Sequence, residues 1–372
     1  MSSSSTLTTK PHYAILDGLR GVAAIVVVIF HLFEAHSLGD HQIQIINHGY
    51  LAVDFFFMLS GFVVGYAYDD RWARISLKEF FTIRLIRLQP MVIVGTLVGA
   101  ALFYSQDSEL FPHIHEVPVW KMLLLTVIGF TLIPVPPSMD IRGWAELHPL
   151  DGPCWSLFYE YVANILYGVW LRRWSNAALG VLVALSGAAV VWLTVFGPAG
   201  EIAGGWSLNE EQIRIGLTRV MYPFFGGLLL SRTVKLRYVP NAFWWCSVLL
   251  VGILAWPRVG GLDLWKNGVY ESVCILLVFP FIVWLGAGGR IEGAGLKRVS
   301  TFLGDISYPL YITHYPLIYS YTAWAIAEKN TMAEAWPWAL ATLAASLLLA
   351  YGSLKLYDEP VRLWLRKRVL GR

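Results

Sequence analysis

The chain is poor in charged residues. Only 14% of its 372 residues are Asp, Glu, Lys or Arg, whereas 56% are hydrophobic. Soluble domains carry roughly 25% charged residues, so this composition excludes an ordinary soluble protein and indicates an integral membrane protein. The sequence also lacks a long polar segment that could form a separate soluble domain. We therefore expect one membrane domain, which we place at residues 12–358.

Cysteine is scarce as well. The three cysteines, Cys154, Cys246 and Cys274, lie far apart in the sequence. Their odd number and wide spacing favour neither a disulfide framework nor a zinc site. The histidines do not show the spacing of metal ligands on one helix, so we expect no metal ion.

Hydrophobic runs dominate the rest of the chain. A run of about 20 apolar residues is long enough to cross a bilayer as a helix. We expect ten such spans, at 12–33, 49–68, 80–104, 154–171, 176–196, 214–231, 241–257, 269–287, 302–326 and 336–356. The Ser/Thr-rich residues 1–11 are expected to be a disordered cytoplasmic N-terminus, and 359–372 a basic cytoplasmic tail.

An eleventh apolar run, 119–134, is shorter and ends in a proline-rich sequence. Basic residues are retained on the cytoplasmic side of a membrane. The predicted outer loops at 34–48, 105–118 and 197–213 contain no Lys or Arg. If 119–134 crossed, the later basic clusters would move outside. The sequence therefore predicts an all-α, polytopic bundle of about ten transmembrane helices, with 119–134 re-entrant or interfacial and both termini cytoplasmic.

Arg20 and His31 lie at the two ends of the first apolar run. An ionisable residue inside a membrane helix is costly, which makes both residues functional candidates. Eleven residues of α-helix span about 16 Å. The predicted topology places Arg20 near the cytoplasmic face and His31 in the outer part of the membrane.

Three further ionisable residues fall inside predicted spans: Asp54, Glu160 and His314. The topology allows them to share one layer with His31, and a histidine oriented by a carboxylate is a suitable general base. Other interpretations stay open. His31 could cap a helix end, Asp54 could be favoured by a helix dipole, and Glu160 could pair with an arginine such as Arg219.

Arg84 and Arg87 mark the cytoplasmic start of the third span. A spacing of three places both guanidinium groups on one helix face, and arginine pairs bind phosphate well. The alternative is ordinary anchoring of a helix end by basic residues. The small residues Ser60 and Gly61 are expected to let the first and second spans approach closely.

Taken together, six motifs in order resemble the acyltransferase-3 family of membrane acyltransferases over nearly the whole chain. They are Leu16-Asp17-Gly18-Leu19-Arg20-Gly21 with His31, Val53 to Phe62, Arg84-Leu85-Ile86-Arg87, Trp155-Ser156-Leu157-Phe158-Tyr159-Glu160, Gly304 to His314, and Asp358-Glu359-Pro360.

The resemblance implies transfer of an acyl group, usually acetyl, from acyl-CoA to a hydroxyl of an exported or surface glycan. It implies that His31 is the catalytic base or a transient acyl carrier, and that Glu160 supports the acceptor side or the histidine. Asp54 is a further catalytic candidate because of its expected place in the same layer. Arg20, Arg84 and Arg87 would serve the donor, acetyl-CoA in the usual case. The acceptor side would use Trp155, Ser156, Tyr159 and His314.

Members of this family also acylate small molecules, including macrolide antibiotics, so the acceptor stays open. The expected location is a bacterial inner membrane, and the expected partners are membrane lipid and the acceptor, with no nucleic acid. A homo-oligomeric assembly stays open. The rival functions are a transporter or flippase without covalent chemistry, and a non-catalytic partner of a glycan assembly complex.

Overall fold

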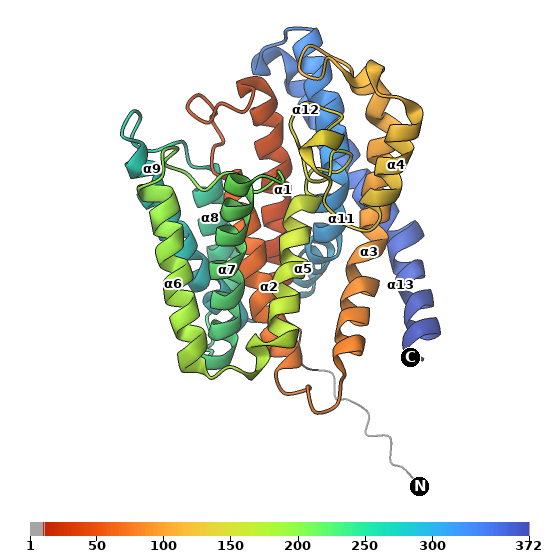
Figure 1. Cartoon of the computed structure of the whole chain (residues 1–372). Coiled ribbons are helices and arrows are strands. Elements are labelled where there is room, and N and C mark those ends of the chain that lie inside the picture. Colours follow the sequence, from red (N-terminus) through yellow and green to blue (C-terminus); the bar gives the residue numbers. More distant parts are fainter. Residues whose placement is uncertain (1–9, 11, 372) are drawn as a thin grey trace.

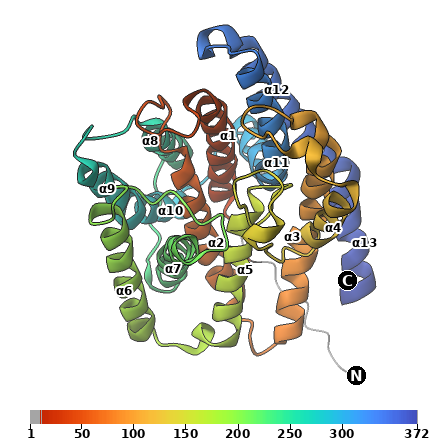
Figure 2. The same ribbon diagram turned by 45° about the horizontal axis from the view of Figure 1, so that its top comes forward.

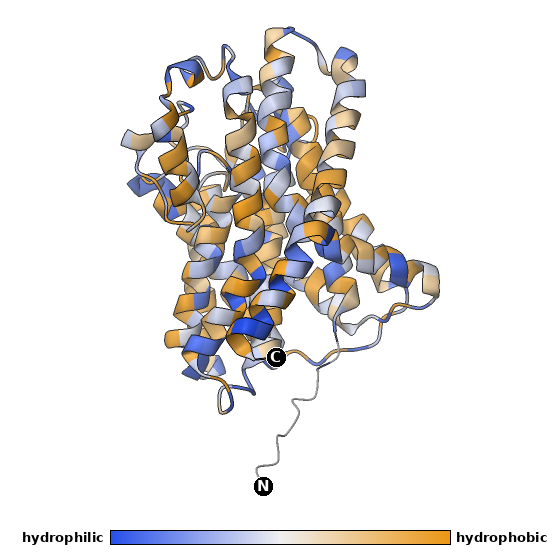
Figure 3. Ribbon diagram, turned by 90° about the vertical axis from the view of Figure 1, so that its right-hand side faces the viewer, coloured by the Kyte–Doolittle hydropathy of each residue, from blue (hydrophilic) through white to orange (hydrophobic). Residues whose placement is uncertain are grey.

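The computed structural model describes residue 10 and residues 12–371. It is a helical bundle, with no β-strand among these residues apart from two isolated bridges (Figure 1). The all-α prediction is confirmed. Hydrophobic residues dominate the helices, and hydrophilic residues gather at the loops and at one end of the bundle (Figure 3).

A helix is present at each of the ten expected spans. The helices are α1 (Ala14–Ser37), α2 (Ala52–Tyr68), α3 (Leu77–Leu102), α5 (Cys154–Val169), α6 (Asn176–Val195), α7 (Glu210–Thr233), α8 (Ala242–Ala255), α9 (Leu264–Val273), α10 (Phe279–Gly288), α11 (Ala294–Ala327) and α12 (Met332–Ser353). Helices α9 and α10 form one span through a π-helical turn.

Seven helical segments of the described chain are long and apolar enough to cross a membrane. The chain is therefore an integral membrane protein. Helices α5 and α8 have only 16 and 14 residues, and α11 has 34 residues. These three fall outside that set of seven, so the number of ten crossings stays a prediction.

Helix α4 (Val119–Gly129) occupies the region of the eleventh apolar run. Its 11 residues span about 16 Å, which is roughly half of the hydrocarbon core of a bilayer. It packs beside α3 and is followed by an irregular loop that returns over the bundle (Figure 1). This length agrees with the expected segment that does not cross.

The loops alternate between the two ends of the bundle. Those after α2 and α5 lie at one end, and those after α1 and α6 lie at the other (Figure 1). This alternation is the one that the charge distribution predicts, and we call the second end the outer end. Which end faces the cytoplasm stays a prediction.

Helix α1 lies in the middle of the bundle against α11 (Figure 2). Gly21 allows this approach, because a Cβ at this position would lie 2.2 Å from the carbonyl oxygen of Leu303. The prediction that Gly61 lets the second span approach the first was wrong. A Cβ there would lie 1.8 Å from the carbonyl oxygen of Phe224, so Gly61 lets α2 approach α7 rather than α1.

The structure describes little of the N-terminal segment and most of the C-terminal tail. The predicted disordered segment 1–11 lies outside the described residues except for Lys10, whose Nζ donates to Asp70. The basic tail contains α13 (Glu359–Leu365), which continues from α12 through a π-helical turn. The tail is therefore helical over most of its length.

Candidate active site

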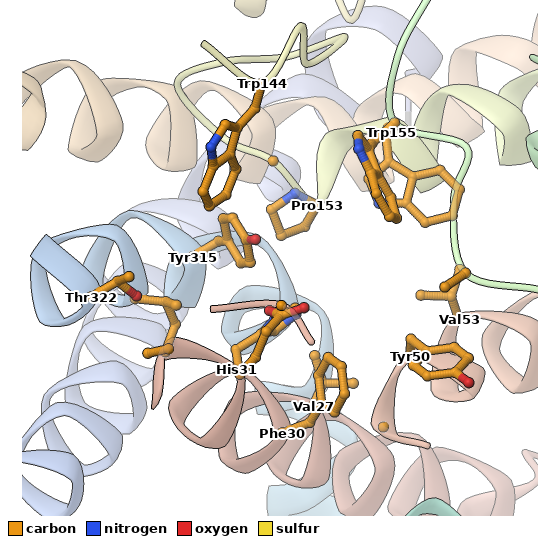
Figure 4. Close-up of a pocket in the computed structure, with 18 of the residues that line it drawn as sticks. Val27, Phe30, His31, Tyr50, Val53, Trp144, Pro153, Trp155, Tyr315 and Thr322 are labelled. Atoms are coloured by element: carbon orange, nitrogen blue, oxygen red, sulfur yellow. The ribbon is translucent and has the colours of Figure 1, made fainter. Parts of the chain in front are cut away.

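A cavity of about 570 Å³ opens at the outer end of the bundle. Its walls come from α1, α11 and the start of α5, together with the loops at 130–153 and 196–209. Figure 4 shows Trp144 and Trp155 on two sides of this outer cavity, above His31 and Tyr315. The remaining lining is largely apolar and aromatic, as in most sites that bind small molecules.

His31 presents a reactive nitrogen to the outer cavity. Its Nδ1 lies 2.5 Å from Oε2 of Glu34, one helical turn further along α1. A carboxylate can only accept a hydrogen bond, so in the neutral imidazole Nδ1 carries the proton and Nε2 the lone pair. The two side chains are 18% and 26% exposed. Nε2 can therefore accept a proton or attack an acyl group.

His314 of α11 lies beside His31, with 5.5 Å between the ring centroids. Its Nδ1 donates to the backbone carbonyl of Tyr311 at 2.9 Å and to that of Leu310 at 3.1 Å. Its Nε2 is therefore an acceptor, and it has no hydrogen-bond partner among the described residues. The expected proximity of the two histidines is present, although His314 is fully buried.

The two outer loops form a roof over the cavity. The backbone N–H of Leu147 donates to the carbonyl of Trp206 at 2.6 Å, which joins the loops. Asp140 holds the first loop in shape by accepting the backbone N–H groups of Arg142 and Ala145. This arrangement brings Trp144, Glu146 and Trp206 to the cavity.

Burial changes the titration of the first loop. It raises the pKa of Glu146 to about 7, against the opposing effects of Arg142 and of the hydrogen bond from Tyr319. Burial also raises the pKa of Asp151 to about 8 and lowers that of His148 to about 3. His148 is therefore neutral at physiological pH, and Glu146 titrates close to it.

A second, inner cavity of about 90 Å³ contains the predicted donor arginines, Arg20, Arg84 and Arg87. Arg84 is already paired, because its Nη2 lies 2.5 Å from Oε1 of Glu160. Arg20 pairs with Asp17 at 3.0 Å and donates to Ser307. Arg87 makes no ion pair or hydrogen bond with any residue that the structure describes. It is the arginine of this cavity that can bind an anionic ligand without breaking a contact.

The inner and outer cavities share two wall residues, Val53 and Tyr311. The hydroxyl of Tyr311 lies 2.7 Å from Oγ of Ser156, which lines the inner cavity. Trp155, the preceding residue, lines the outer one. Arg20 and His31 lie on the same helix, about 16 Å apart along its axis. The geometry can therefore bring a donor from one side and an acceptor from the other to a common wall.

The structure does not form the single layer of ionisable residues that we expected. Glu160 belongs to the inner cavity and pairs with Arg84 rather than with Arg219. Asp54 pairs instead with Arg219 at 2.7 Å, and the two side chains are 0% and 1% exposed. Asp54 lines neither cavity. Its place beside His31 is taken by Glu34.

Tyr159 also lies away from both cavities. It packs so closely against α7 that a Cβ at Gly216 would lie 2.2 Å from its ring. Sequence reasoning missed Glu34, although its spacing of three from His31 on one helix was a usable signal. It also missed Glu146, Trp144 and Trp206, which lie in loops without a recognisable pattern.

The comparisons with known proteins agree with this architecture. The sequence model of the acyltransferase-3 family, described as an acyltransferase domain, matches residues 13–354. The chain belongs to the acyltransferase-3 family. No solved structure matches it. As a member of this family with long apolar helices, it is a membrane-bound acyltransferase.

Three relatives show how far the similarity extends. The acyltransferase MdmB of Streptomyces mycarofaciens is 24% identical, over 82% of this chain and 78% of that protein. The peptidoglycan O-acetyltransferase OatA of Listeria monocytogenes is 22% identical, over 96% of this chain but only 57% of that protein. Protein 2 in the picA locus of Rhizobium radiobacter is 30% identical, over 47% of this chain and 90% of that protein.

Proposed function

We propose that this protein transfers an acyl group, acetyl in the usual case, from cytoplasmic acyl-CoA to a hydroxyl of an exported or cell-surface polysaccharide or oligosaccharide. The observation that carries the proposal is the pair of cavities that meet at Val53 and Tyr311. One cavity contains the unpaired Arg87, and the other contains the His31–Glu34 pair. The proposed membrane is the bacterial inner membrane, with the inner cavity toward the cytoplasm.

The donor would be held by its phosphate groups. CoA carries several phosphates, and a guanidinium group binds phosphate through paired hydrogen bonds. Arg87 is the residue for this contact, with Arg20 and Arg84 adding positive charge beside it. The thioester would then pass Tyr311, where the two cavities adjoin, to approach His31.

The acceptor hydroxyl would enter the outer cavity and meet Nε2 of His31. In direct transfer, Nε2 removes the hydroxyl proton while the oxygen attacks the thioester carbonyl carbon. The new O–C bond forms, the C–S bond breaks, and the proton passes to the departing thiolate of CoA. In the alternative route, Nε2 first attacks the thioester carbonyl carbon, the C–S bond breaks and CoA leaves as the thiolate. The acceptor hydroxyl then attacks the acyl group, the N–C bond to His31 breaks, and the hydroxyl proton passes to the thiolate. Glu34 stabilises the positively charged imidazolium in the direct route.

The test uses a host that lacks the gene, with wild type and His31→Ala produced at matched membrane abundance. Mass spectrometry of surface glycans and secreted metabolites should find one added acyl group only with the wild type. Acylation of secreted small molecules alone would favour the small-molecule acceptor. Absence of an acyl increment together with transmembrane movement of an unmodified glycan would favour the transporter or flippase.

A further inference from the structure

The roof of the outer cavity contains a carboxylate that no part of the proposed reaction uses. Glu146 is only 6% exposed and nevertheless lines the cavity. Its Oε1 accepts a hydrogen bond from the hydroxyl of Tyr319 at 2.5 Å. Its Oε2 has no hydrogen-bond partner among the described residues. A buried polar atom without a partner is costly, so Oε2 is placed to accept a hydrogen bond from a ligand.

The other carboxylates of the cavity are already engaged. Glu34 accepts from His31, and Glu201 accepts from Arg258 and from His41. Arg142 lies close to Glu146 but does not pair with it. Its guanidinium group instead stacks on the ring of Tyr319, 3.7 Å from the ring centroid, and donates to the carbonyl of Pro149 and to Gln106. Glu146 is therefore a hydrogen-bond acceptor that is free and held in one orientation.

Aromatic side chains line the same cavity as this carboxylate. Trp144, Trp155 and Trp206 line the same cavity, and Trp144 and Trp206 are 37% and 39% exposed. An indole ring presents a flat apolar face, which matches the C–H face of a pyranose ring. A carboxylate in the same cavity matches the hydroxyl groups at the ring edge. This is the composition of a site for an uncharged sugar.

We propose that Glu146 and the three tryptophans form a sugar-binding subsite that holds a hydroxyl of the acceptor through Glu146 Oε2 and rejects sugars bearing a carboxylate. The inference rests on the proposed function for its acceptor, but the binding site itself exists independently of the reaction. Discrimination follows from like charge, because two carboxylates placed together in a complex repel each other. Glu146 is accordingly a residue that determines specificity and positions the acceptor.

The test uses the purified full-length protein in detergent at pH 8, where Glu146 is ionised. The probes are cellotetraose and the same tetrasaccharide oxidised at C6, in which each CH2OH group is replaced by a carboxylate. Calorimetry measures binding of each probe without acyl-CoA. We expect the wild type to bind cellotetraose about tenfold more tightly than the oxidised form. Glu146→Gln should weaken cellotetraose binding several-fold and remove most of that discrimination.

Two further variants guard against a folding artefact. Tyr319→Phe keeps the carboxylate but removes the hydroxyl that orients it, so it should also weaken cellotetraose binding. Glu116→Gln removes an exposed carboxylate that is paired with His113 outside the outer cavity, and it should bind both probes as the wild type does. Thermal unfolding should give the same midpoint for the wild type and Glu116→Gln, and a single cooperative transition for all four proteins.

The outcomes separate this inference from the proposed function. Failure of the wild type to bind cellotetraose, or unchanged binding and discrimination in Glu146→Gln, would overturn the subsite. Glu146-dependent binding without acyl transfer from acetyl-CoA would support the subsite and count against the proposed reaction. Transfer to cellotetraose with a raised acceptor KM in Glu146→Gln, and an unchanged KM for acetyl-CoA, would support both.

Discussion

The contact between His31 and Glu34 gives the sharpest prediction. Replacing Glu34 by Gln keeps the size of the side chain but removes the charge that faces the imidazole at 2.5 Å. If His31 becomes positively charged in the transition state, the loss of that charge raises the barrier. The substitution should therefore lower kcat and leave the KM for acyl-CoA unchanged, because the donor arginines line the other cavity.

The magnitude follows from the distance and the exposure. Two opposite unit charges about 4 Å apart attract by about 4 kcal/mol at an effective dielectric constant of about 20. Both side chains keep some contact with solvent, at 18% and 26% exposure, so we take about 2 kcal/mol as the lower bound. Each 1.36 kcal/mol is about a tenfold change in rate, so kcat should fall by between about 30-fold and 1,000-fold.

The assay is steady-state release of CoA by purified protein in the presence of an acceptor, compared with the exposed control Glu116→Gln. Thermal unfolding of Glu34→Gln should show that the fold is retained. A kcat within about threefold of the wild type would refute the reasoning, because it would mean that His31 develops no charge opposite Glu34. A large increase in the KM for acyl-CoA with an unchanged kcat would equally contradict it.

The other predictions concern the remaining charged groups. Arg87→Ala should raise the KM for acyl-CoA at least about tenfold and leave the midpoint of thermal unfolding unchanged. Arg84→Ala should lower that midpoint, because it leaves the Glu160 carboxylate without its cation. Equal effects of the two variants on both readouts would contradict this assignment. Asp54→Asn should lower the free energy of unfolding by about 3 kcal/mol, because it leaves Arg219 buried without its carboxylate. The double variant Asp54→Leu with Arg219→Met should recover most of that loss. Denaturation in detergent measures both effects. Sugar binding should strengthen as the pH rises through about 7, because the carboxyl of Glu146 loses its proton there. The groups that face this carboxyl are Arg142, Asp140, Asp151, Tyr315 and Tyr319. A Glu146→Gln protein with the same pH step would show that another group is responsible.

The same titration affects stability with the opposite sign. The pKa of Glu146 is raised in the folded protein, so the folded state binds the proton more tightly than the unfolded state does. This contribution to the free energy of unfolding is therefore present at low pH and is lost as the pH rises toward about 7. Substrate binding and stability thus place different demands on the protonation of this group.

Much of the helical architecture could be predicted from the sequence, because apolar length is a direct requirement of the bilayer. The run at 119–134 was predicted not to cross because charge distribution and length pointed the same way. It was harder to predict which helices pack against each other. Gly61 signalled a close approach, but nothing in its neighbourhood specified α7 rather than α1.

The site was predicted in part. His31, His314 and the three arginines were found because ionisable residues are rare inside membrane helices, and the structure places them at two adjoining cavities or directly beside them. Charge alone could not assign partners, so Asp54 and Glu160 were placed with the histidine when each instead pairs with an arginine. Glu146 could not be found at all. Its role depends on how two irregular loops meet above α11, which no sequence period describes.

The most direct test of the account uses proteoliposomes with acetyl-CoA on the side of the inner cavity and an oligosaccharide acceptor on the other side. We predict that the wild type produces acetylated oligosaccharide and releases CoA on the donor side. The His31→Ala protein, inserted in the same amount and orientation, should produce neither. Acetylation by His31→Ala at the rate of the wild type would contradict the claim that this histidine catalyses acyl transfer from the donor to the acceptor.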